Sequence, residues 1–515
     1  MLNATPARAQ RQSRPIWVRG ATLVDPVAGE EGGTKADILV RDGQIAAIGE
    51  GAAAVRAPDD AEIFEASSLI AIPGLVNAHY HSHDALLKGA FDVMSLERWA
   101  VRALPRYFPP RSDRELRLRT LIGAAECLRG GISTVQDMLS LWPLTSRQAA
   151  IVRDTYRETG LRVVLGLQLA DTGPLDTIPY LRDILPADLA GIVAGPPPPP
   201  DMPAPVAELE HILAELPAEP NDRVTWAVCP SSPERCSQAL LARLLEIARA
   251  HSVRLFSHVA ISRVEAVGAR MLFEAHGGSP IRYLDSIGAL GPDLTLAHGV
   301  WLDDDDARLL ADSGTRLVMN PMSNLKTRNG IAPYRRYAES GIRPGLGCDN
   351  CSCSDAQNMF QAMKFSVLLA GIAGRSDDGP GARDSLRAAT ADGAHALGLD
   401  TTGRLSPGFK ADITFLDRDD PVYRPLNDAT RQIVYGEAGR GVSAVMVDGR
   451  FVVRDRKLLT IDEDALADEL AELMPAVLRE AEAVRARAER LDPYLAEAEA
   501  RSWEVDVGMT RMACE

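Results

Sequence analysis

The middle of the chain alternates between short apolar runs and amphipathic stretches, from Pro73 to about Leu399. Runs such as RVTWAVCP, VRLFSHVA and LTLAHGV are typical of buried strands, whereas SQALLARLLEIARAH and DDDDARLLADSG have helical spacing. Strands that alternate with helices are typical of a parallel α/β fold. We therefore predict an α/β fold whose main unit, residues 73–402, is a (β/α)8 TIM-like barrel.

The two ends of the chain differ from its middle. From Ile16 to about Ile72, and again in GRLSPGFKADITFLD and SAVMVDGRFVVRD, short alternating runs are broken by Gly and Asp turns, as in β-strands. These two β-rich segments are expected to pair with each other. Besides the barrel we thus predict a flexible N-terminal arm at residues 1–15, a small composite β-sandwich of residues 16–72 plus 403–460, and a C-terminal helical extension at residues 461–515.

An excess of acidic residues limits the kinds of partner. The 515-residue chain has a formal net charge of −15, which disfavours binding to nucleic acid or to an anionic membrane. We therefore expect no nucleic-acid partner and no membrane partner. A small-molecule substrate that is neutral or cationic fits this charge better.

The seven cysteines are scattered and odd in number, so they do not form the pattern of a disulfide framework. No stretch approaches the ~18 uncharged apolar residues of a membrane span, and the first residues lack the apolar core of a secretory signal. Free thiols suit a reducing compartment, so we predict a cytoplasmic protein.

The segment PGLVNAHYHSHD offers a pair of metal ligands. His79 and His81 stand two residues apart after an apolar run, and the period of two in a β-strand points both imidazoles to one side. Imidazole is a common ligand of ions such as Zn2+. This spacing alone is a moderate signal, so it needs partners elsewhere in the chain.

Further candidate ligands occur where later strand-like runs end. His258 lies in RLFSHVA, His298 in LTLAHGV and Asp349 in GLGCDN. Barrel enzymes build their active sites at the carboxyl ends of the strands, so these side chains are expected to meet His79 and His81. A single buried histidine is most simply a core residue. The chain has nine histidines, and four of them lie at the ends of strand-like runs, which favours a metal site over four separate core positions.

These motifs resemble the amidohydrolase superfamily, in particular its branch of chlorohydrolases and aminohydrolases that act on triazines and nucleoside-like heterocycles. The resemblance runs from about Val18 to Thr460 and rests on PGLVNAHYH, HGVWLDDDDARLLADSG, NPMSNLKTRNGIAP and GLGCDN. It implies a homo-oligomer and a metal site. No lysine stands where two-metal members carry a bridging lysine, so one divalent ion is implied.

The resemblance also implies which residues hold the ion. The implied ligands are His79, His81, His258 and Asp349. His298 is implied either as a further ligand or as a group that hydrogen-bonds water or substrate. Imidazoles with a carboxylate suit several ions, so we expect Zn2+ first, with Fe2+, Co2+ or Mn2+ as alternatives.

One position departs from that family. Deaminating members carry a glutamate three residues after the strand-five histidine, and this glutamate protonates a substrate nitrogen. Here that position is Ile261, which cannot transfer a proton. We predict His83 as its replacement, because histidine titrates close to neutrality. Glu265 is an alternative that has to fold back, and we interpret it instead as a charge on a helix surface.

Without this glutamate the chain is more similar to the amidohydrolases that cleave phenylurea and thiocarbamate (molinate) herbicides. We therefore predict a metal-dependent hydrolase that cleaves a non-peptide C–N or C–S bond of a small amide, urea, carbamate or thiocarbamate. The first alternative is an aminohydrolase, deaminase or dehalogenase of a heteroaromatic ring. The second is a non-catalytic metal-binding barrel.

Catalytic roles and a substrate-binding set complete the prediction. The ion is expected to lower the pKa of water from 15.7 toward ~7. Asp349 is expected to accept the proton of that water, and His298 to steady the oxyanion. The residues predicted to contact substrate are Ser231, Ser232, Ile261 and Asn324. For the two serines, a turn or a helix cap explains the sequence equally well.

Overall fold

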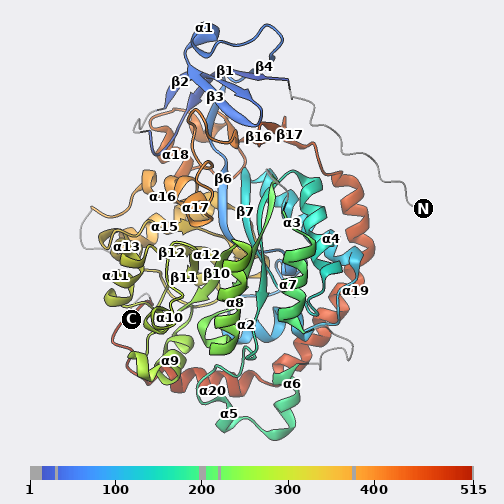
Figure 1. Cartoon of the computed structure of the whole chain (residues 1–515), viewed down its shortest axis with the longest axis vertical. Coiled ribbons are helices and arrows are strands. Elements are labelled where there is room, and N and C mark those ends of the chain that lie inside the picture. The colour runs from blue at the N-terminus through green and yellow to red at the C-terminus, as the bar shows by residue number, and fades with distance from the viewer. Residues whose placement is uncertain (1–13, 29–32, 196–203, 219–221, 374–377, 513–515) are drawn as a thin grey trace.

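The computed structural model describes residues 14–28, 33–195, 204–218, 222–373 and 378–512. Figure 1 shows a β-sheet unit at the top of the view and a larger α/β unit below it. The predicted flexible arm at residues 1–15 lies outside the described residues, except for Arg14 and Pro15.

The larger unit is a barrel of parallel strands that follow one another in sequence order. The first seven are β6 (Leu75–His81), β7 (Ile132–Leu139), β8 (Arg162–Leu169), β9 (Val224–Pro230), β10 (Arg254–Val259), β11 (Leu294–His298) and β12 (Arg316–Met319). The next segment supplies the eighth strand in two short pieces. β13 (Gly345–Leu346) pairs with β12, and β14 (Asp349–Asn350) pairs with β6. This segment closes the barrel, which confirms the predicted (β/α)8 fold.

Apolar side chains fill the barrel interior. The buried cluster inside it contains Val76, Ala78, Met138, Val164, Ala227, Cys229, Phe256 and Val318. Strands that are covered on both faces need apolar residues at successive positions, and every residue of β6 and β7 is buried. For this reason the barrel strands are recognisable in the sequence as apolar runs.

Helices cover the outside of the barrel. In α8 (Gln238–His251), Ser237 caps the N-terminus by accepting a hydrogen bond from the amide of Leu240, and Leu241 and Leu244 belong to a buried stripe. The other helices of the two units are α1 (Gly51–Val55), α2 (Leu96–Ala103), α3 (Asp113–Arg129), α4 (Ser146–Thr159), α5 (Leu181–Ile184), α6 (Ala190–Ala194), α7 (Pro205–Glu215), α9 (Arg263–Leu272), α10 (Pro280–Ser286), α11 (Asp304–Ser313), α12 (Pro321–Lys326), α13 (Tyr334–Glu339), α14 (Cys351–Ser354), α15 (Met359–Ile372), α16 (Ala382–Ala388), α17 (Ala391–Ala396) and α18 (Ala429–Tyr435).

Both ends of the chain build the β-sheet unit. Its strands are β1 (Ile16–Leu23), β2 (Thr34–Arg41), β3 (Gln44–Gly49), β4 (Glu62–Glu65), β5 (Leu69–Pro73), β15 (Ile413–Asp417), β16 (Val442–Val447), β17 (Arg450–Arg454) and β18 (Lys457–Leu458). β5 pairs with β15 in antiparallel orientation and so joins the two ends. Asp448 and Gly449 both have positive φ in the turn between β16 and β17, as the Asp-Gly pair predicts. The predicted composite β unit is confirmed.

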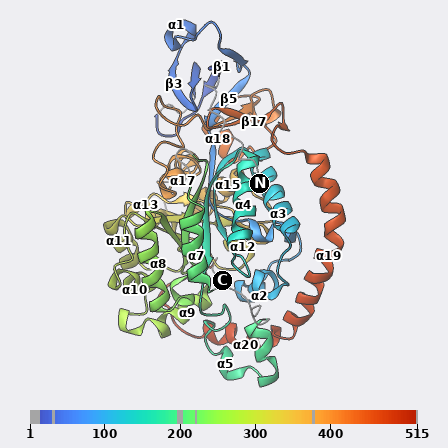
Figure 2. The ribbon, with the colours of Figure 1, turned by 45° about the vertical axis from the view of Figure 1, so that its right-hand side comes forward.

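Two helices follow the β-sheet unit. Figure 2 shows α19 (Glu463–Glu489) running along one side of the molecule and α20 (Asp492–Trp503) passing below the barrel. Leu466, Val477, Val484 and Ala488 of α19 are buried. The apolar stripe of α19 therefore packs within its own chain.

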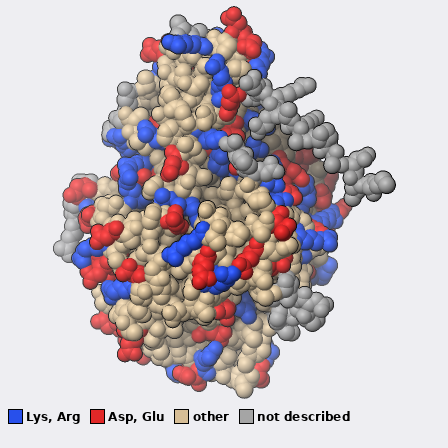
Figure 3. All heavy atoms as spheres, viewed as in Figure 1, with Lys and Arg blue, Asp and Glu red and all other residues tan. Residues whose placement is uncertain are grey.

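The surface carries charges of both signs. On the face drawn in Figure 3, Lys and Arg side chains are interspersed with Asp and Glu side chains. Within the described ranges, no helix combines the length and the apolar character that crossing a membrane requires.

Candidate metal centre

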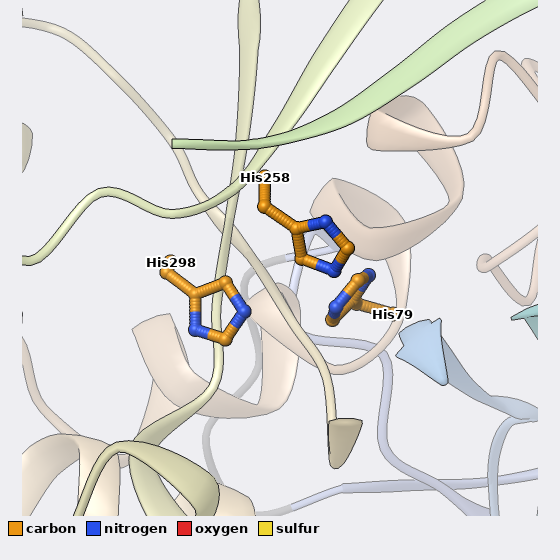
Figure 4. Close-up of side chains that lie close together, drawn as sticks. All are labelled: His79, His258 and His298. Carbon is orange, nitrogen blue, oxygen red and sulfur yellow. The ribbon is translucent and has the colours of Figure 1, made fainter. Parts of the chain in front are cut away.

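Five side chains with metal-binding atoms meet at the carboxyl ends of four barrel strands. His79 and His81 end β6, His258 lies in β10, His298 ends β11 and Asp349 begins β14. All five are buried. Figure 4 shows the imidazoles of His79, His258 and His298 converging from different strands. The ligand atoms of these three histidines lie within 4.8 Å of one another. The ligand atoms of a second group, His79, His81 and Asp349, also lie within 4.8 Å of one another.

Hydrogen bonds behind three of the imidazoles determine which nitrogen carries the proton. Nδ1 of His81 lies 2.6 Å from the carbonyl oxygen of Met138, and Nδ1 of His258 lies 2.6 Å from that of Ser231. A carbonyl oxygen only accepts, so Nδ1 is the donor in both rings. Nδ1 of His298 donates in the same way to Oδ1 of Asn324 at 2.9 Å. In a neutral ring, Nε2 then carries a lone pair.

These lone pairs face one another and the Asp349 carboxylate. Nε2 of His79 and Nε2 of His81 lie 3.4 Å and 3.3 Å from Oδ1 of Asp349, and Nε2 of His258 lies 3.3 Å from Nε2 of His81. Nε2 of His79 is buried and makes no hydrogen bond of good geometry. Buried acceptors that face each other without a donor repel, and a cation between them removes the repulsion. The residues therefore fit a divalent metal ion.

His298 and Asp349 occupy unusual backbone conformations. Their φ angles are 78° and 65°, in the left-handed region that residues other than glycine seldom adopt. Nε2 of His298 lies 3.8 Å from Oδ2 of Asp349, and Ser323 Oγ donates a hydrogen bond to the same carboxylate oxygen. Such strain collects at functional sites, where the surrounding structure enforces a side-chain direction.

Burial keeps most of the imidazoles neutral. It lowers the pKa of His79 to about 4, the pKa of His258 well below its ordinary value, and the pKa of His298. Burial acts on His81 as well, but the Asp349 carboxylate beside its Nε2 favours the protonated ring and raises the pKa of His81 as long as no cation lies between them. Burial alone raises the pKa of Asp349, yet its contacts with His79 and His81 hold that pKa well below the usual range. Neutral imidazoles and an ionised carboxylate are the protonation states that metal binding requires.

A pocket opens directly onto these ligands. We call it the metal pocket; its lining includes His81, His83, Leu96, Trp99, Ala100, Gln168, Ile178, Ser231, Ser232, Arg235, His258, Ile261, Val264, Glu265, His298 and Asp349. Its walls are largely apolar, with few polar groups close to the metal ligands. Such a lining is typical of a small-molecule site.

The structure places three of the four predicted substrate-binding residues in this lining. Ser231, Ser232 and Ile261 all face the pocket. The Ser231 hydroxyl accepts hydrogen bonds from Gln168 Nε2 and Arg235 Nη1, so it is also held from behind. Asn324 does not line the pocket but hydrogen-bonds His298. Its position suits a residue that orients His298 and does not touch substrate.

His83 lines the pocket beside the metal ligand His81. Its ring centre lies 5.2 Å from that of His81, and its Nε2 lies 3.3 Å from Asn350 Nδ2. Burial first, and then the neighbouring charges of His81 and Arg119, lower the pKa of His83 well below its ordinary value. This direction disfavours a ring that titrates close to neutrality, and the role of His83 as proton donor stays a prediction.

Glu265 also lines the metal pocket, so its interpretation as a helix-surface charge is wrong. The local sequence Ser-x-x-Glu explains its position. Ser262 caps α9 by accepting from the Glu265 amide at 3.1 Å, and Glu265 Oε2 reaches back to accept from the Ile261 amide at 2.8 Å. This pairing resembles a capping box, a signal that was available in the sequence.

Neighbouring carboxyl groups make Glu265 a weak acid. Burial, together with the nearby Glu234 and Glu97 side chains, raises the pKa of Glu265 to about 8. Burial raises the pKa of Glu234 as well, and neither of its carboxyl oxygens has a hydrogen-bond partner. Glu265 therefore holds a proton at neutral pH within the pocket that contains the metal ligands.

Comparison with known proteins places this site in a family. Residues 70–452 match the sequence model of the Amidohydrolase family. The chain is 30% identical over 471 residues to a 5'-deoxyadenosine deaminase of Methanothermobacter thermautotrophicus, which covers 90% of this chain and 98% of the relative.

Solved structures agree on the fold. An adenosine deaminase from Xanthomonas campestris with bound zinc superposes with a TM-score of 0.75 at 22% identity, over 92% of this chain and 98% of that one. The atrazine chlorohydrolase of Arthrobacter aurescens TC1, complexed with zinc, gives a TM-score of 0.75 at 21% identity, over 89% and 100% of the two chains.

These similarities decide between the predicted classes. The resemblance to the amidohydrolase superfamily is confirmed, whereas the narrower similarity to phenylurea and thiocarbamate hydrolases stays a prediction. A non-catalytic barrel has no support, because the family and the deaminase relative both indicate hydrolysis of carbon–nitrogen bonds other than peptide bonds. The chain belongs to the amidohydrolase family.

Proposed function

We propose that the protein is an aminohydrolase that uses one zinc ion to replace the amino group of a heteroaromatic ring with a hydroxyl or oxo group. The relative named a deaminase and the two neighbours with bound zinc support this proposal. The set of imidazoles with one carboxylate also suits zinc. Among the functions predicted from the sequence, this alternative is favoured over hydrolysis of an amide, urea, carbamate or thiocarbamate.

The observation that carries the proposal is the position of the Glu265 carboxyl group in the lining of the metal pocket. Water attacks an aromatic ring carbon readily only when a ring nitrogen is protonated, because protonation draws electrons away from that carbon. Ile261 cannot supply this proton. Glu265 lines the same pocket, and its raised pKa of about 8 keeps it in the acid form at neutral pH. His83 is the weaker candidate because its ring is neutral.

The remaining groups have roles that follow from their hydrogen bonds. When bound, the metal ion lowers the pKa of the attacking water from 15.7 toward ~7. Asp349, oriented by Ser323, accepts the proton of that water and passes it to the departing amine. His298 donates through Nδ1 to Asn324, so its Nε2 acts as a ligand or accepts from water. This tautomer disfavours the predicted role of His298 as a donor to an oxyanion.

Product analysis tests the proposal. Protein with a measured zinc content is incubated with aminated heterocycles, ureas, carbamates, thiocarbamates and anilides. We expect ammonia release from the heterocycles and a kcat/KM that falls as pH rises through about 8, because Glu265 then loses its proton. Glu265→Gln is expected to lower kcat/KM by ~10²–10⁴-fold. The control Glu274→Gln, at an exposed glutamate outside the metal pocket, is expected to leave it unchanged.

A second candidate function rests on Ile261. Attack on the carbonyl carbon of a urea, carbamate or thiocarbamate needs no protonated ring nitrogen, so an apolar residue at this position is compatible with it. Release of an amine or a thiol without ammonia, unaffected by Glu265→Gln, would assign the enzyme to this second class.

A further inference from the structure

A second hollow adjoins the metal pocket. It shares Leu104, Gln168, Ser231 and Arg235 with the metal pocket and extends beyond them to Arg106 and Trp142. We call this hollow the second lobe. Because the two hollows share four lining residues, one elongated ligand can occupy both.

Arg235 stands at the junction of the two hollows without a carboxylate partner. It follows β9 in a short 3-10 helix, and its Nη1 donates to the Ser231 hydroxyl at 3.1 Å. Its Nε is buried and has no hydrogen-bond partner. No ion pair of Arg235 exists within the described part of the chain. The nearby Glu265 is largely protonated at neutral pH, so it does not neutralise this charge.

Arg106 is a second cation in the same lobe. Its Nη2 donates to the carbonyl oxygen of Ala194 at 2.7 Å, and its guanidinium lies 5.7 Å from the centre of the Trp142 ring. Its Nε, like that of Arg235, is buried without a partner, and the described residues give it no ion pair. Ring contacts and single carbonyl groups leave most of its donors free.

Arg223 and Arg263 also lack an ion pair within the described ranges, so what distinguishes Arg235 and Arg106 is that both line one hollow beside the metal pocket. Arg102 and Arg162, for comparison, each form an ion pair with a carboxylate, Asp492 and Asp412 respectively. An arginine cannot release its proton to avoid the cost of burial, so a partly buried guanidinium needs an anion nearby. Two such groups on one lobe leave a fork of donors that matches a carboxylate or a phosphate.

We propose that the second lobe binds an anionic group, a carboxylate or a phosphate, at the far end of an elongated substrate, through Arg235 and Arg106. The reacting ring then lies in the metal pocket, and this part rests on the proposed function. Gln168 and Ser231 line both hollows, and Trp142, whose ring lies against the Arg106 guanidinium, forms part of the wall of the second lobe. The net charge of −15 favours neutral or cationic substrates, but the local charge of the lobe opposes that expectation.

Binding measurements on the zinc-loaded protein test the proposal without turnover. The probes are inosine, inosine 5'-monophosphate and inosine 5'-carboxylate, which carry no amino group to lose. We expect at least one anionic probe to bind about tenfold or more tightly than inosine, a difference that corresponds to one charge-assisted contact. Whichever anion binds more tightly identifies the source of the charge. Equal affinity of all three probes, or no binding of any, overturns the proposal.

Variants separate the lobe from the reaction. Arg235→Met and Arg106→Met are each expected to abolish most of the preference for the anionic probe, and Arg243→Met, an exposed arginine on α8, is expected to retain it. If Arg235→Met fails to fold, Arg235→Lys serves instead; it keeps the charge and loses the fork, so a carboxylate preference is expected to weaken. An unchanged preference in these variants contradicts the proposal. Absence of ammonia release alone contradicts only the proposed function.

Discussion

At the scale of single residues, the centre depends on groups that hold the metal ligands from behind. Three imidazoles are each held by an acceptor: His81 by the carbonyl oxygen of Met138, His258 by that of Ser231, and His298 by the side chain of Asn324. The Asp349 carboxylate is held by the hydroxyl of Ser323. Such partners determine which imidazole nitrogen faces the metal and how basic it is. A change behind a ligand is therefore expected to alter metal binding although it does not touch the ion.

Asn324 provides a test of this dependence. Asn324→Leu removes the acceptor for Nδ1 of His298, so the ring is free to rotate or to change tautomer. We expect a loss of about 10–100-fold in metal affinity or in kcat. Competition with a chelator measures the affinity, and turnover at full metal occupancy measures kcat.

The conservative variant Asn324→Asp keeps an acceptor and is expected to retain most of both quantities. If affinity alone falls in the leucine variant, His298 is a ligand. If kcat falls at full occupancy, His298 acts on water. Wild-type values for both quantities in the leucine variant would contradict the orienting role of Asn324.

The sequence indicated the cluster of four histidines and Asp349 more directly than the position of Glu265. His79 and His81 are recognisable because a strand has a fixed period, and the other ligands follow apolar runs. Glu265 is only an alternative in the sequence, because its place in the pocket lining depends on a hydrogen bond to the Ile261 amide that forms in the folded chain. Arg106 and Arg235 were not singled out, because only the folded loops show that they share a hollow.

At the scale of elements, the first turn of α9 places Glu265 in the lining of the metal pocket. The N-cap Ser262 accepts from the Glu265 amide in the first turn of α9. Its hydroxyl also donates to Glu97 Oε1 at 2.7 Å, and because Glu97 belongs to α2, this bond joins the start of α9 to α2. Placing carboxyl groups so close together in a buried wall costs stability whenever they ionise.

This cost predicts a pH-dependent effect on stability. The pKa of Glu265 is about 8 in the folded protein against 4.5 ordinarily, so between these values the unfolded chain loses a proton that the folded chain keeps. The contribution of the Glu265 carboxyl group to the free energy of unfolding is therefore fully present below pH 4.5, and it is lost as the pH rises to about 8. Glu265→Gln cannot ionise, and its amide oxygen can still accept from the Ile261 amide.

We expect the free energy of unfolding of Glu265→Gln, minus that of the wild type, to increase from pH 5 to pH 8. Above pH 8 this difference is expected to stay constant. Urea unfolding at several pH values measures it. A difference that is independent of pH would show that Glu265 ionises normally in the folded state.

The barrel elements were predictable because each strand is buried on both faces and forms an apolar run. The eighth strand is the exception, since it consists of two pieces of two residues each, β13 and β14. The strand-like run that ends at Asp349 indicates a strand here, but it does not indicate the division into two pieces. Its two pieces pair with different neighbours, and such pairing is a tertiary property.

At the scale of the whole molecule, a buried ion pair joins the barrel to the β-sheet unit. Arg162, at the start of β8, donates from Nε and Nη2 to the two carboxylate oxygens of Asp412 at 2.9 Å and 3.1 Å. Asp412 also accepts from the Asp448 amide. The start of a barrel strand lies opposite the metal centre, where residues serve stability.

Removing one partner of this pair tests its structural role. Asp412→Ala leaves the Arg162 guanidinium largely buried with only the more distant Asp448 carboxylate, and we expect a loss of about 3–5 kcal/mol in unfolding free energy. Denaturant unfolding measures the loss, and metal content is expected to stay at the wild-type value. The double variant Arg162→Met/Asp412→Leu is expected to recover much of the stability. A loss of metal in Asp412→Ala without loss of stability would contradict this assignment.

The pairing of β5 with β15 also constrains the order of events during synthesis. β5 pairs with the earlier strand β1 on one edge, but on the other edge Ile72 lies opposite Thr414, so this second pairing forms only after the whole barrel segment has left the ribosome. Such distant pairings slow folding, because the loop between them has to close first. Until then, the edge of β5 that faces β15 is unpaired in the nascent chain, and unpaired strand edges are where newly made proteins aggregate. A chaperone that binds extended apolar segments during translation is expected to act on this part of the chain.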